Sequence, residues 1–157
     1  MEKILITFGT RPLAQRVKQA LADQFEVFLA TSEEFPTILK SSIYSIPKGV
    51  NPTFAHEVLK LALDLNINYI LPLGYQELAP FAESHMLFEE YGIEILSPKR
   101  EELPLVFLLE NPSKDTKLNV YRNGRSLHKD GLTVSTSFSG LGLVSDDGDR
   151  IALAICK

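Results

Sequence analysis

Short apolar runs alternate with helical patterns along the first 103 residues of the chain. The runs are rich in strand-forming residues, which is typical of strands buried on both faces of a parallel sheet. They cover residues 3–8, 25–30, 43–46, 69–73 and 93–96. Between them, mainly apolar side chains recur every three or four residues, the spacing of one helix face. These positions are Leu13, Val17, Ala20 and Leu21; Phe54, Val58, Leu61, Ala62 and Leu65; and Leu78, Phe81, Ala82, His85 and Phe88.

Residues that begin and end helices stand at the borders of these patterns. A capping side chain shortly before a proline predicts three helix starts: Thr10 with Pro12, Asn51 with Pro52, and Ser97 with Pro98. The last of these helices is expected to run to about residue 103. Ser32, followed by two glutamates, predicts a further short helix start. Gly92 is expected to end the third helix in a left-handed conformation.

Strands that alternate with helices imply right-handed βαβ units and a parallel sheet. The pattern therefore predicts an α/β fold with a five-stranded parallel Rossmann-like sheet over residues 1–103, in the strand order 3-2-1-4-5. In this order the winding reverses between the first and fourth strands. Ligands of open α/β sheets bind at such a reversal, beside the carboxyl ends of the strands.

The pattern changes after residue 103. Residues 104–109 are apolar without a clear period, and residues 111–113 read as a turn. Short alternating runs follow, separated by pairs that favour hairpins: Asn123–Gly124, Asp130–Gly131, Ser139–Gly140 and Asp147–Gly148. Strands are expected near 117–122, 125–128, 132–138, 141–145 and 149–156. Residues 104–157 are thus interpreted as a C-terminal antiparallel β-hairpin appendage that packs on the first domain or on another chain.

The turn after the first strand, Gly9–Ala14, admits three interpretations. A dinucleotide-binding fingerprint needs three glycines, of which only the first is present, and the Gly-Lys-Ser/Thr ending of a P-loop is absent. Pro12 also removes one N–H donor near the helix start. A plain strand-to-helix turn is the second interpretation. In the third, the turn faces a ligand of another kind, with Arg11 at the carboxyl end of the first strand.

The fourth strand supports a ligand site at this position. The strand order places the turn at residues 9–11 opposite residues 73–77, so that Arg11, Tyr75 and Glu77 would share one crevice. A guanidinium, a phenol and a carboxylate together suit a small polar ligand. The candidate ligand-binding residues are Gly9, Thr10, Arg11, Gly74, Tyr75 and Glu77. The alternative for Glu77 is a charge that stabilises the N-terminus of the following helix.

Composition narrows the classes of function. The 157 residues are 45% hydrophobic and 23% charged, as in globular domains. A net charge of −4 gives no general attraction to nucleic acid or to an anionic membrane, so neither is expected as a partner. No apolar run reaches the roughly 18 residues of a membrane helix. The single cysteine, Cys156, and the lack of a signal segment favour a cytoplasmic location.

Patterns for metal, cofactor or nucleophilic chemistry are missing from the sequence. The three histidines are scattered, no metal-ligand spacing appears, and no cofactor is expected. His85 is interpreted as a satisfied side chain on the apolar side of its helix. The basic residues between 114 and 129 are interpreted as a solvated strand face rather than an RNA contact. Ser139–Gly142 is interpreted as a hairpin, and the Asp-rich stretch 146–149 as a charged hairpin tip.

A family resemblance appears in residues 66–103, NINYILPLGYQELAPFAESHMLFEEYGIEILSPKREEL. Its parts are the strand Asn68–Pro72, the helix opening Glu77–Leu78, the stretch Phe88–Ile93, and Leu96–Pro98. The early KILITFGT, and YSIP followed by NPTF, fit the same scheme. Together they resemble the N-terminal Rossmann-like (pre-ATP-grasp) domain of ATP-grasp enzymes, especially the carbamoyl-phosphate-synthase-like group.

The departures from that family shape the functional expectation. The first turn carries Arg11–Pro12 in place of small residues, the family's aspartate after the second strand is replaced by Ala30–Ser32, and its Asp-Lys pair is missing after Glu102. The ATP-grasp domains, which supply the nucleotide lysines and metal carboxylates in the family, are absent. The resemblance implies a stand-alone or split domain that binds a small polar ligand or an ATP-grasp partner chain and is not catalytic alone. The alternatives are a homodimer assembled through the β appendage and a nucleotide-binding enzyme that uses the Rossmann edge.

Overall fold

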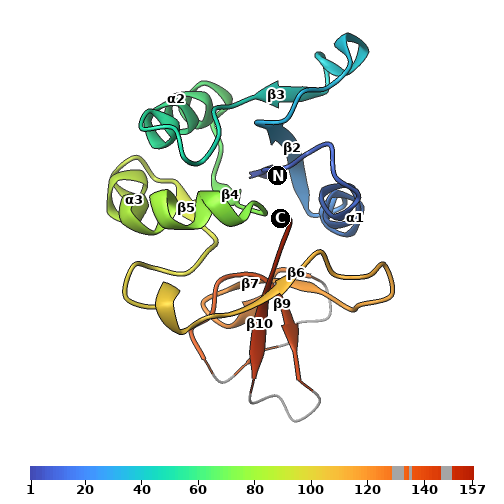
Figure 1. Cartoon of the computed structure of the whole chain (residues 1–157), viewed down its shortest axis with the longest axis vertical. Helices are drawn as coiled ribbons and strands as arrows, with labels where there is room; N and C mark the ends of the chain where they lie inside the picture. Colours follow the sequence, from blue (N-terminus) through green and yellow to red (C-terminus); the bar gives the residue numbers. More distant parts are fainter. Residues whose placement is uncertain (129–132, 135, 146–149) are drawn as a thin grey trace.

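The parallel sheet has its strands in the order β3-β2-β1-β4-β5, which confirms the predicted order. The computed structural model describes residues 1–128, 133–134, 136–145 and 150–157. The strands are β1 (Glu2–Ile6), β2 (Phe25–Thr31), β3 (Ile43–Ser45), β4 (Tyr69–Leu71) and β5 (Glu94–Ile95). Every neighbouring pair runs parallel. β1 and β4 therefore lie side by side where the winding reverses (Figure 1).

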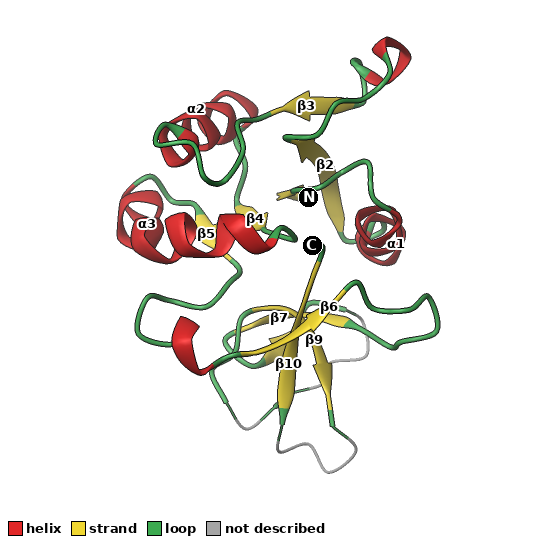
Figure 2. Cartoon of the chain, viewed as in Figure 1, coloured by secondary structure: helices red, strands yellow, loops and turns green. Residues whose placement is uncertain are grey.

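Helices cover both faces of this sheet (Figure 2). α1 (Pro12–Leu21) lies on one face, and α2 (Phe54–Leu65) and α3 (Leu78–Glu90) lie on the other. The rings of Phe54, Phe81 and Phe88 meet edge to face in the core of the α2–α3 side, with centroids 5.0 and 5.9 Å apart. α3 ends as predicted, because Gly92 has a φ of 77° and Ile93 donates its N–H to the Phe88 carbonyl. Among the described residues, no helix is both long enough and apolar enough to cross a membrane.

A second sheet, in the order β6-β10-β9-β7-β8, packs beside α1. Its strands are β6 (Phe107–Glu110), β7 (Asn119–Arg122), β8 (Arg125–Ser126), β9 (Gly140–Val144) and β10 (Ile151–Ile155). Its pairs are antiparallel, as predicted, except that β6 runs parallel to β10. The aperiodic residues 104–109 therefore contain most of an additional strand. The C-terminal part of the chain is a mixed, mainly antiparallel sheet.

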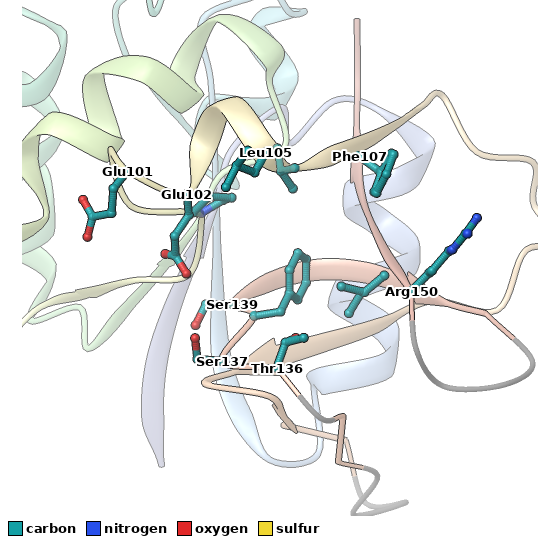
Figure 3. Close-up of a pocket in the computed structure, with 12 residues that line it drawn as sticks. Glu101, Glu102, Leu105, Phe107, Thr136, Ser137, Ser139 and Arg150 are labelled. Atoms are coloured by element: carbon teal, nitrogen blue, oxygen red, sulfur yellow. The ribbon is translucent and has the colours of Figure 1, made fainter.

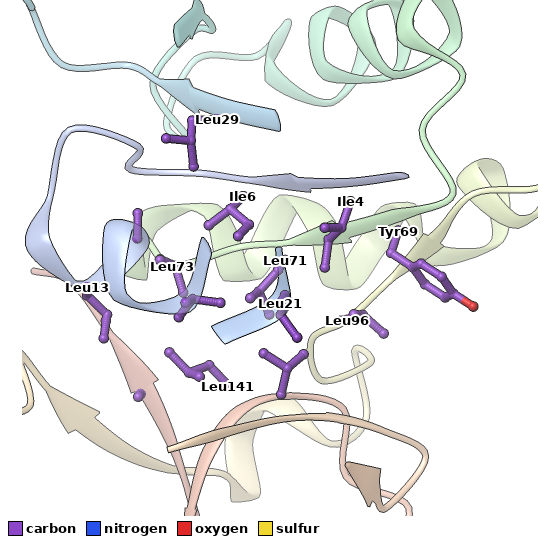
Figure 4. Close-up of a cluster of buried hydrophobic side chains, with 14 of the residues drawn as sticks. Ile4, Ile6, Leu13, Leu21, Leu29, Tyr69, Leu71, Leu73, Leu96 and Leu141 are labelled. Atoms are coloured by element: carbon purple, nitrogen blue, oxygen red, sulfur yellow. The ribbon is translucent and has the colours of Figure 1, made fainter. Parts of the chain in front are cut away.

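The core between the two sheets is continuous (Figure 4). Ile6 of β1 and Leu71 of β4 belong to the same buried cluster as Leu13 and Leu21 of α1 and Leu141 of β9. In doubly wound domains helices alone cover this face. Here the second sheet covers the part of the face that α1 leaves open.

Two predicted helix starts do not form. At Ser32 the chain bends, because the Thr31 hydroxyl accepts the N–H of Glu33, and only a short 3-10 helix, η1 (Thr37–Leu39), follows. After Ser97–Pro98 there is a turn at residues 100–102 and then the 3-10 helix η3 (Leu103–Leu105). Pro104 has no N–H to donate within an α-helix, and it lies inside the short 3-10 helix η3.

Of the predictions made for caps and turns, some are confirmed and others are wrong. Thr10 does not cap α1, whose N-cap residue is Arg11, and the residue before α2 is Thr53 rather than Asn51. Gly140–Gly142 lie within β9 and do not form a hairpin. The Asn123–Gly124 hairpin does form, with φ values of 49° and 82°, and joins β7 to β8. Asp130–Gly131 and Asp147–Gly148 lie outside the described residues.

Candidate functional site

The turn after β1 uses its own N–H groups. Gly9 donates its N–H to the Ala30 carbonyl, and Arg11 donates its N–H to the Phe8 carbonyl, each at 2.9 Å. Phe8 has a φ of 53°, in the left-handed region that costs a non-glycine residue about 1–2 kcal/mol. Two donors of the turn are thus unavailable to a phosphate, and Pro12 has none to offer. This geometry disfavours the pyrophosphate-loop interpretation.

Arg11 forms an ion pair with Glu33. Its Nε and Nη2 each lie 2.9 Å from a carboxylate oxygen, and the Thr10 hydroxyl donates to the same carboxylate at 3.3 Å. The hydrogen bond between the two side chains is the main cause that raises the pKa of Arg11 and lowers the pKa of Glu33. The two side chains are 35% and 34% exposed, so the pair remains in contact with solvent at the sheet edge.

Glu77 lies beneath the surface, 1% exposed, at the junction of η2 (Tyr75–Glu77) and α3. Its Oε1 accepts a hydrogen bond from the Thr7 hydroxyl at 2.5 Å and from the Gly74 N–H at 3.2 Å. Its Oε2 is buried and has no hydrogen-bond partner among the described residues. Burial raises the pKa of Glu77 to about 7, although both hydrogen bonds act to lower it. The carboxyl does stand at a helix start, but in a desolvated position.

The last residues of the chain cover the carboxyl end of β4. Cys156 donates its N–H to the Leu73 carbonyl at 2.6 Å, and its carbonyl accepts the N–H of Tyr75 at 3.2 Å. Cys156 thus forms a parallel bridge with Gly74. Burial raises the pKa of the Cys156 thiol to about 11, and the thiol also interacts electrostatically with Arg11 and Glu77. The C-terminal strand therefore lies in the crevice where the winding reverses.

The remaining predicted residues have structural roles at this edge. A Cβ on Gly9 would lie 2.7 Å from the Cβ of Leu29, and one on Gly74 would lie 2.5 Å from the Phe8 ring, so both positions require close backbone approach. Tyr75 is 46% exposed, and the Lys157 ammonium lies 5.2 Å from its ring centroid.

The six predicted residues thus gather at one sheet edge but do not form one cluster. Arg11 and Thr10 contact Glu33, Glu77 contacts Thr7, and Tyr75 contacts the C-terminal residues. Sequence reasoning did not place Thr7, Glu33 or Cys156 at this site. Thr7 left a signal, because it is a hydroxyl in an otherwise apolar part of the first run. Glu33 and Cys156 left none, since their contacts join distant parts of the chain.

An apolar groove of about 530 Å³ lies between the η3–β6 segment and residues 136–139 (Figure 3). Leu105 and Phe107 lie on one side of it, and Thr136 and Ser137 lie on the other. Glu101 and Glu102 stand at one end and Arg150 at the other. The groove is therefore apolar in the middle, with opposite charges at its ends.

A polar cavity of about 390 Å³ adjoins this groove, and Glu101, Glu102, Ser137 and Ser139 line both. His85 of α3 and Ser97 also line the cavity, and they are 9% and 2% exposed. His85 Nε2 and Ser97 Oγ are buried without a hydrogen-bond partner in the described part of the chain. Burial lowers the pKa of His85, so the imidazole is neutral at pH 7. The prediction that His85 is a fully satisfied side chain is wrong for Nε2.

Exposed apolar side chains gather along the edge of the second sheet. Leu105, Phe107 and Leu108, which we call the β6 surface, are 80%, 68% and 37% exposed. β6 is the first strand of its sheet and pairs with β10 alone among the described strands. A hydrophobic edge strand that is exposed in this way marks a site where another chain pairs or docks.

In the part of the chain that the structure describes, no group of three or more His, Cys, Asp or Glu side chains is arranged to hold a metal ion. A scan against known protein families and a search of curated proteins find no match to this chain. Function is therefore inferred from the chemistry of the crevice, the groove, the cavity and the β6 surface.

Proposed function

We propose that this chain is a non-catalytic binding module that resembles a pre-ATP-grasp domain and docks an ATP-grasp partner chain through the β6 surface. The observation that carries the proposal is the exposure of Leu105 in η3 and of Phe107 and Leu108 in β6, a strand that pairs with β10 alone among the described strands. Burying such side chains against a partner contributes about 25 cal/mol per Å² of apolar area. A chain that keeps large apolar side chains in water at η3 and on β6 gains stability when a partner covers them.

The position of this surface also supports an ATP-grasp partner. The resemblance to the family covers residues 1–103, and the family's chain passes on to its ATP-binding part directly after this region. Here the same position leads into η3 and β6. A separate ATP-grasp chain that docked on the β6 surface would thus meet the domain where the family has a covalent connection.

The carboxyl ends of β1 and β4, where the winding reverses, form what we call the switch-point edge. This edge supports a small polar ligand less well than the β6 surface supports a partner chain. Cys156 occupies the crevice between the predicted contact residues, and Arg11 is already paired with Glu33. A ligand that entered there would have to displace the C-terminal residues or break that ion pair. A small-ligand role for Arg11 therefore remains a separate prediction.

Affinity capture of binding proteins by the full chain, from cells that express it naturally, tests the proposal. We expect mass spectrometry to identify an ATP-grasp protein, and Phe107→Lys to abolish its capture by placing a charge at the centre of the surface. Met86→Lys is the matched control, because Met86 is 74% exposed on α3 and lies outside the β6 surface. Equal capture by Phe107→Lys, or no ATP-grasp protein among the bound chains, would contradict the proposal.

A second copy of the chain is a second candidate partner, favoured by the free edge of β6. Antiparallel pairing of two β6 strands about a two-fold axis would join the two sheets. Light scattering after size-exclusion chromatography, over a concentration series, separates the candidates. A dimer that Phe107→Lys dissociates supports self-pairing, and a monomer at every concentration refutes it.

A further inference from the structure

The polar cavity beside His85 contains more hydrogen-bonding capacity than the described residues use. Ser97 Oγ and His85 Nε2 are both buried, both on residues that line the cavity, and both without a partner. Buried polar atoms in folded proteins are almost always hydrogen-bonded, and a water or ion at the site is one explanation of an exception. Two such atoms on one cavity wall are an independent indication that the cavity receives a polar group.

The chemistry of His85 defines what that group must supply. Burial is the main cause that lowers the pKa of His85, whereas hydrogen bonding to the backbone of Pro98 and Ser97 acts to raise it. Because Pro98 has no N–H, the backbone group must be its carbonyl, which accepts a proton from one ring nitrogen. The other nitrogen, Nε2, is then a hydrogen-bond acceptor, since the imidazole is neutral. A ligand that fits Nε2 must donate an N–H or O–H.

The charges around the cavity favour a cation as the donor. Glu89, Glu94, Glu101 and Glu102 line it against one lysine, Lys99. Glu94 is paired with Arg122, at 2.9 Å, and Glu102 accepts the backbone N–H of Lys99 at 3.0 Å. Glu89 and Glu101 are both exposed. These carboxylates are not arranged to hold a metal ion, so the excess negative charge suits an organic cation that also carries N–H donors.

The neighbouring groove adds an apolar contact for the rest of such a molecule. Glu101, Glu102, Ser137 and Ser139 line both spaces, so the polar cavity opens toward Leu105 and Phe138. Ligand sites commonly combine a mostly apolar wall with a few convergent polar groups. From this combination we infer that the cavity binds a small organic ammonium ion, with its N–H donors directed to His85 and Ser97 and its apolar body in the groove. The inference does not depend on the proposed partner.

Two probes of the same frame test this assignment. 2-Phenylethylamine carries an ammonium group beside a phenyl ring, and phenylacetate carries a carboxylate in its place. In NMR titrations of the full chain, we expect 2-phenylethylamine to shift the His85 ring and Ser97 amide signals until the site is saturated. The expected Kd is about 1 mM. Phenylacetate should leave these signals unchanged. Equal shifts with both probes, or none with the amine, as when water alone fills the cavity, would overturn the inference.

Variants separate the contribution of the cavity from general charge effects. Glu101→Gln removes an exposed carboxylate from the cavity wall and should weaken amine binding about fivefold, equal to ~1 kcal/mol. Glu90→Gln removes a carboxylate at the end of α3 that does not line the cavity, and it should leave Kd unchanged. Ser97→Ala should also weaken binding, because it removes one of the two unpartnered acceptors. Equal weakening by Glu101→Gln and Glu90→Gln would mean that the amine senses only the net charge of the protein.

Discussion

Replacing Glu77 with glutamine should change how the stability of this protein depends on pH. Burial raises the pKa of Glu77 from 4.5 to about 7 in the folded state. Below pH 4.5 the carboxyl is protonated whether the chain is folded or not. Between the two values the folded state holds a proton that the unfolded state has lost, so the free energy of unfolding falls as pH rises toward 7. A difference of two and a half pKa units corresponds to about 3 kcal/mol.

Glu77→Gln imitates the protonated side chain and removes this titration. The amide oxygen can still accept the hydrogen bonds from Thr7 and Gly74 that Oε1 accepts now. The free energy of unfolding of the variant minus that of the natural chain should therefore increase by about 3 kcal/mol from about pH 4 to about pH 8.5. Urea denaturation followed by circular dichroism measures the free energy of unfolding of each chain. Subtracting one value from the other cancels the titrations of Glu33 and His85, which the two chains share. A difference that stays flat over this range, or falls, would refute a desolvated carboxyl at this position. Glu90→Gln, on the exposed end of α3, should give a flat difference and serves as the control.

Three further predictions follow from single contacts. Because the pKa of Cys156 is raised from 9.0 to about 11, its alkylation by iodoacetamide at neutral pH should be about a hundredfold slower in the folded chain than in urea; equal rates would contradict its burial. Gly124→Ala should lower the free energy of unfolding by at least about 2 kcal/mol, because Gly124 has a φ of 82° and a Cβ there would lie 2.1 Å from the Thr136 carbonyl oxygen; a variant that melts like the natural chain would exclude this turn. Arg11→Ala should change stability by less than about 1 kcal/mol, since the ion pair with Glu33 is one-third exposed, and it should abolish any thermal shift caused by a ligand of the switch-point edge; a shift that survives would remove Arg11 from ligand binding.

The parallel sheet was predictable because local patterns carry its information. Each strand is a short apolar run between amphipathic helices. Because βαβ connections are right-handed, five such strands can be ordered in only a few ways. Gly92 and Pro12 mark helix ends by constraints that act within a few residues. The antiparallel strands around Asn123–Gly124 were predictable for the same reason, because the turn residues alone favour that hairpin.

Contacts between distant residues were not predictable. β6 has no period, and its register comes from β10, more than forty residues later in the chain. The helix expected after Ser97 shows that a capping signal alone does not make a helix, because the chain turns at residues 100–102 and passes through η3 into the second sheet. At the switch point, the residue types were appropriate but their partners were not foreseeable. Glu33 reaches Arg11 only because β1 and β2 lie side by side, and Glu77 reaches Thr7 only because β1 adjoins β4.

The bridge between Cys156 and Gly74 also bears on the order in which the chain folds. During synthesis, β1 to β5 leave the ribosome before β10 exists, so the face beside α1 stays uncovered while the remaining residues are made. The core residues Leu13 and Leu71 share a buried cluster with Ala154 and Cys156, and that cluster can close only when the last strand arrives. The buried cluster should therefore form late in folding. Its formation depends on contacts between residues far apart in the sequence, and such contacts slow folding. Until then, the half-covered sheet exposes apolar surface, which makes a folding intermediate prone to aggregate.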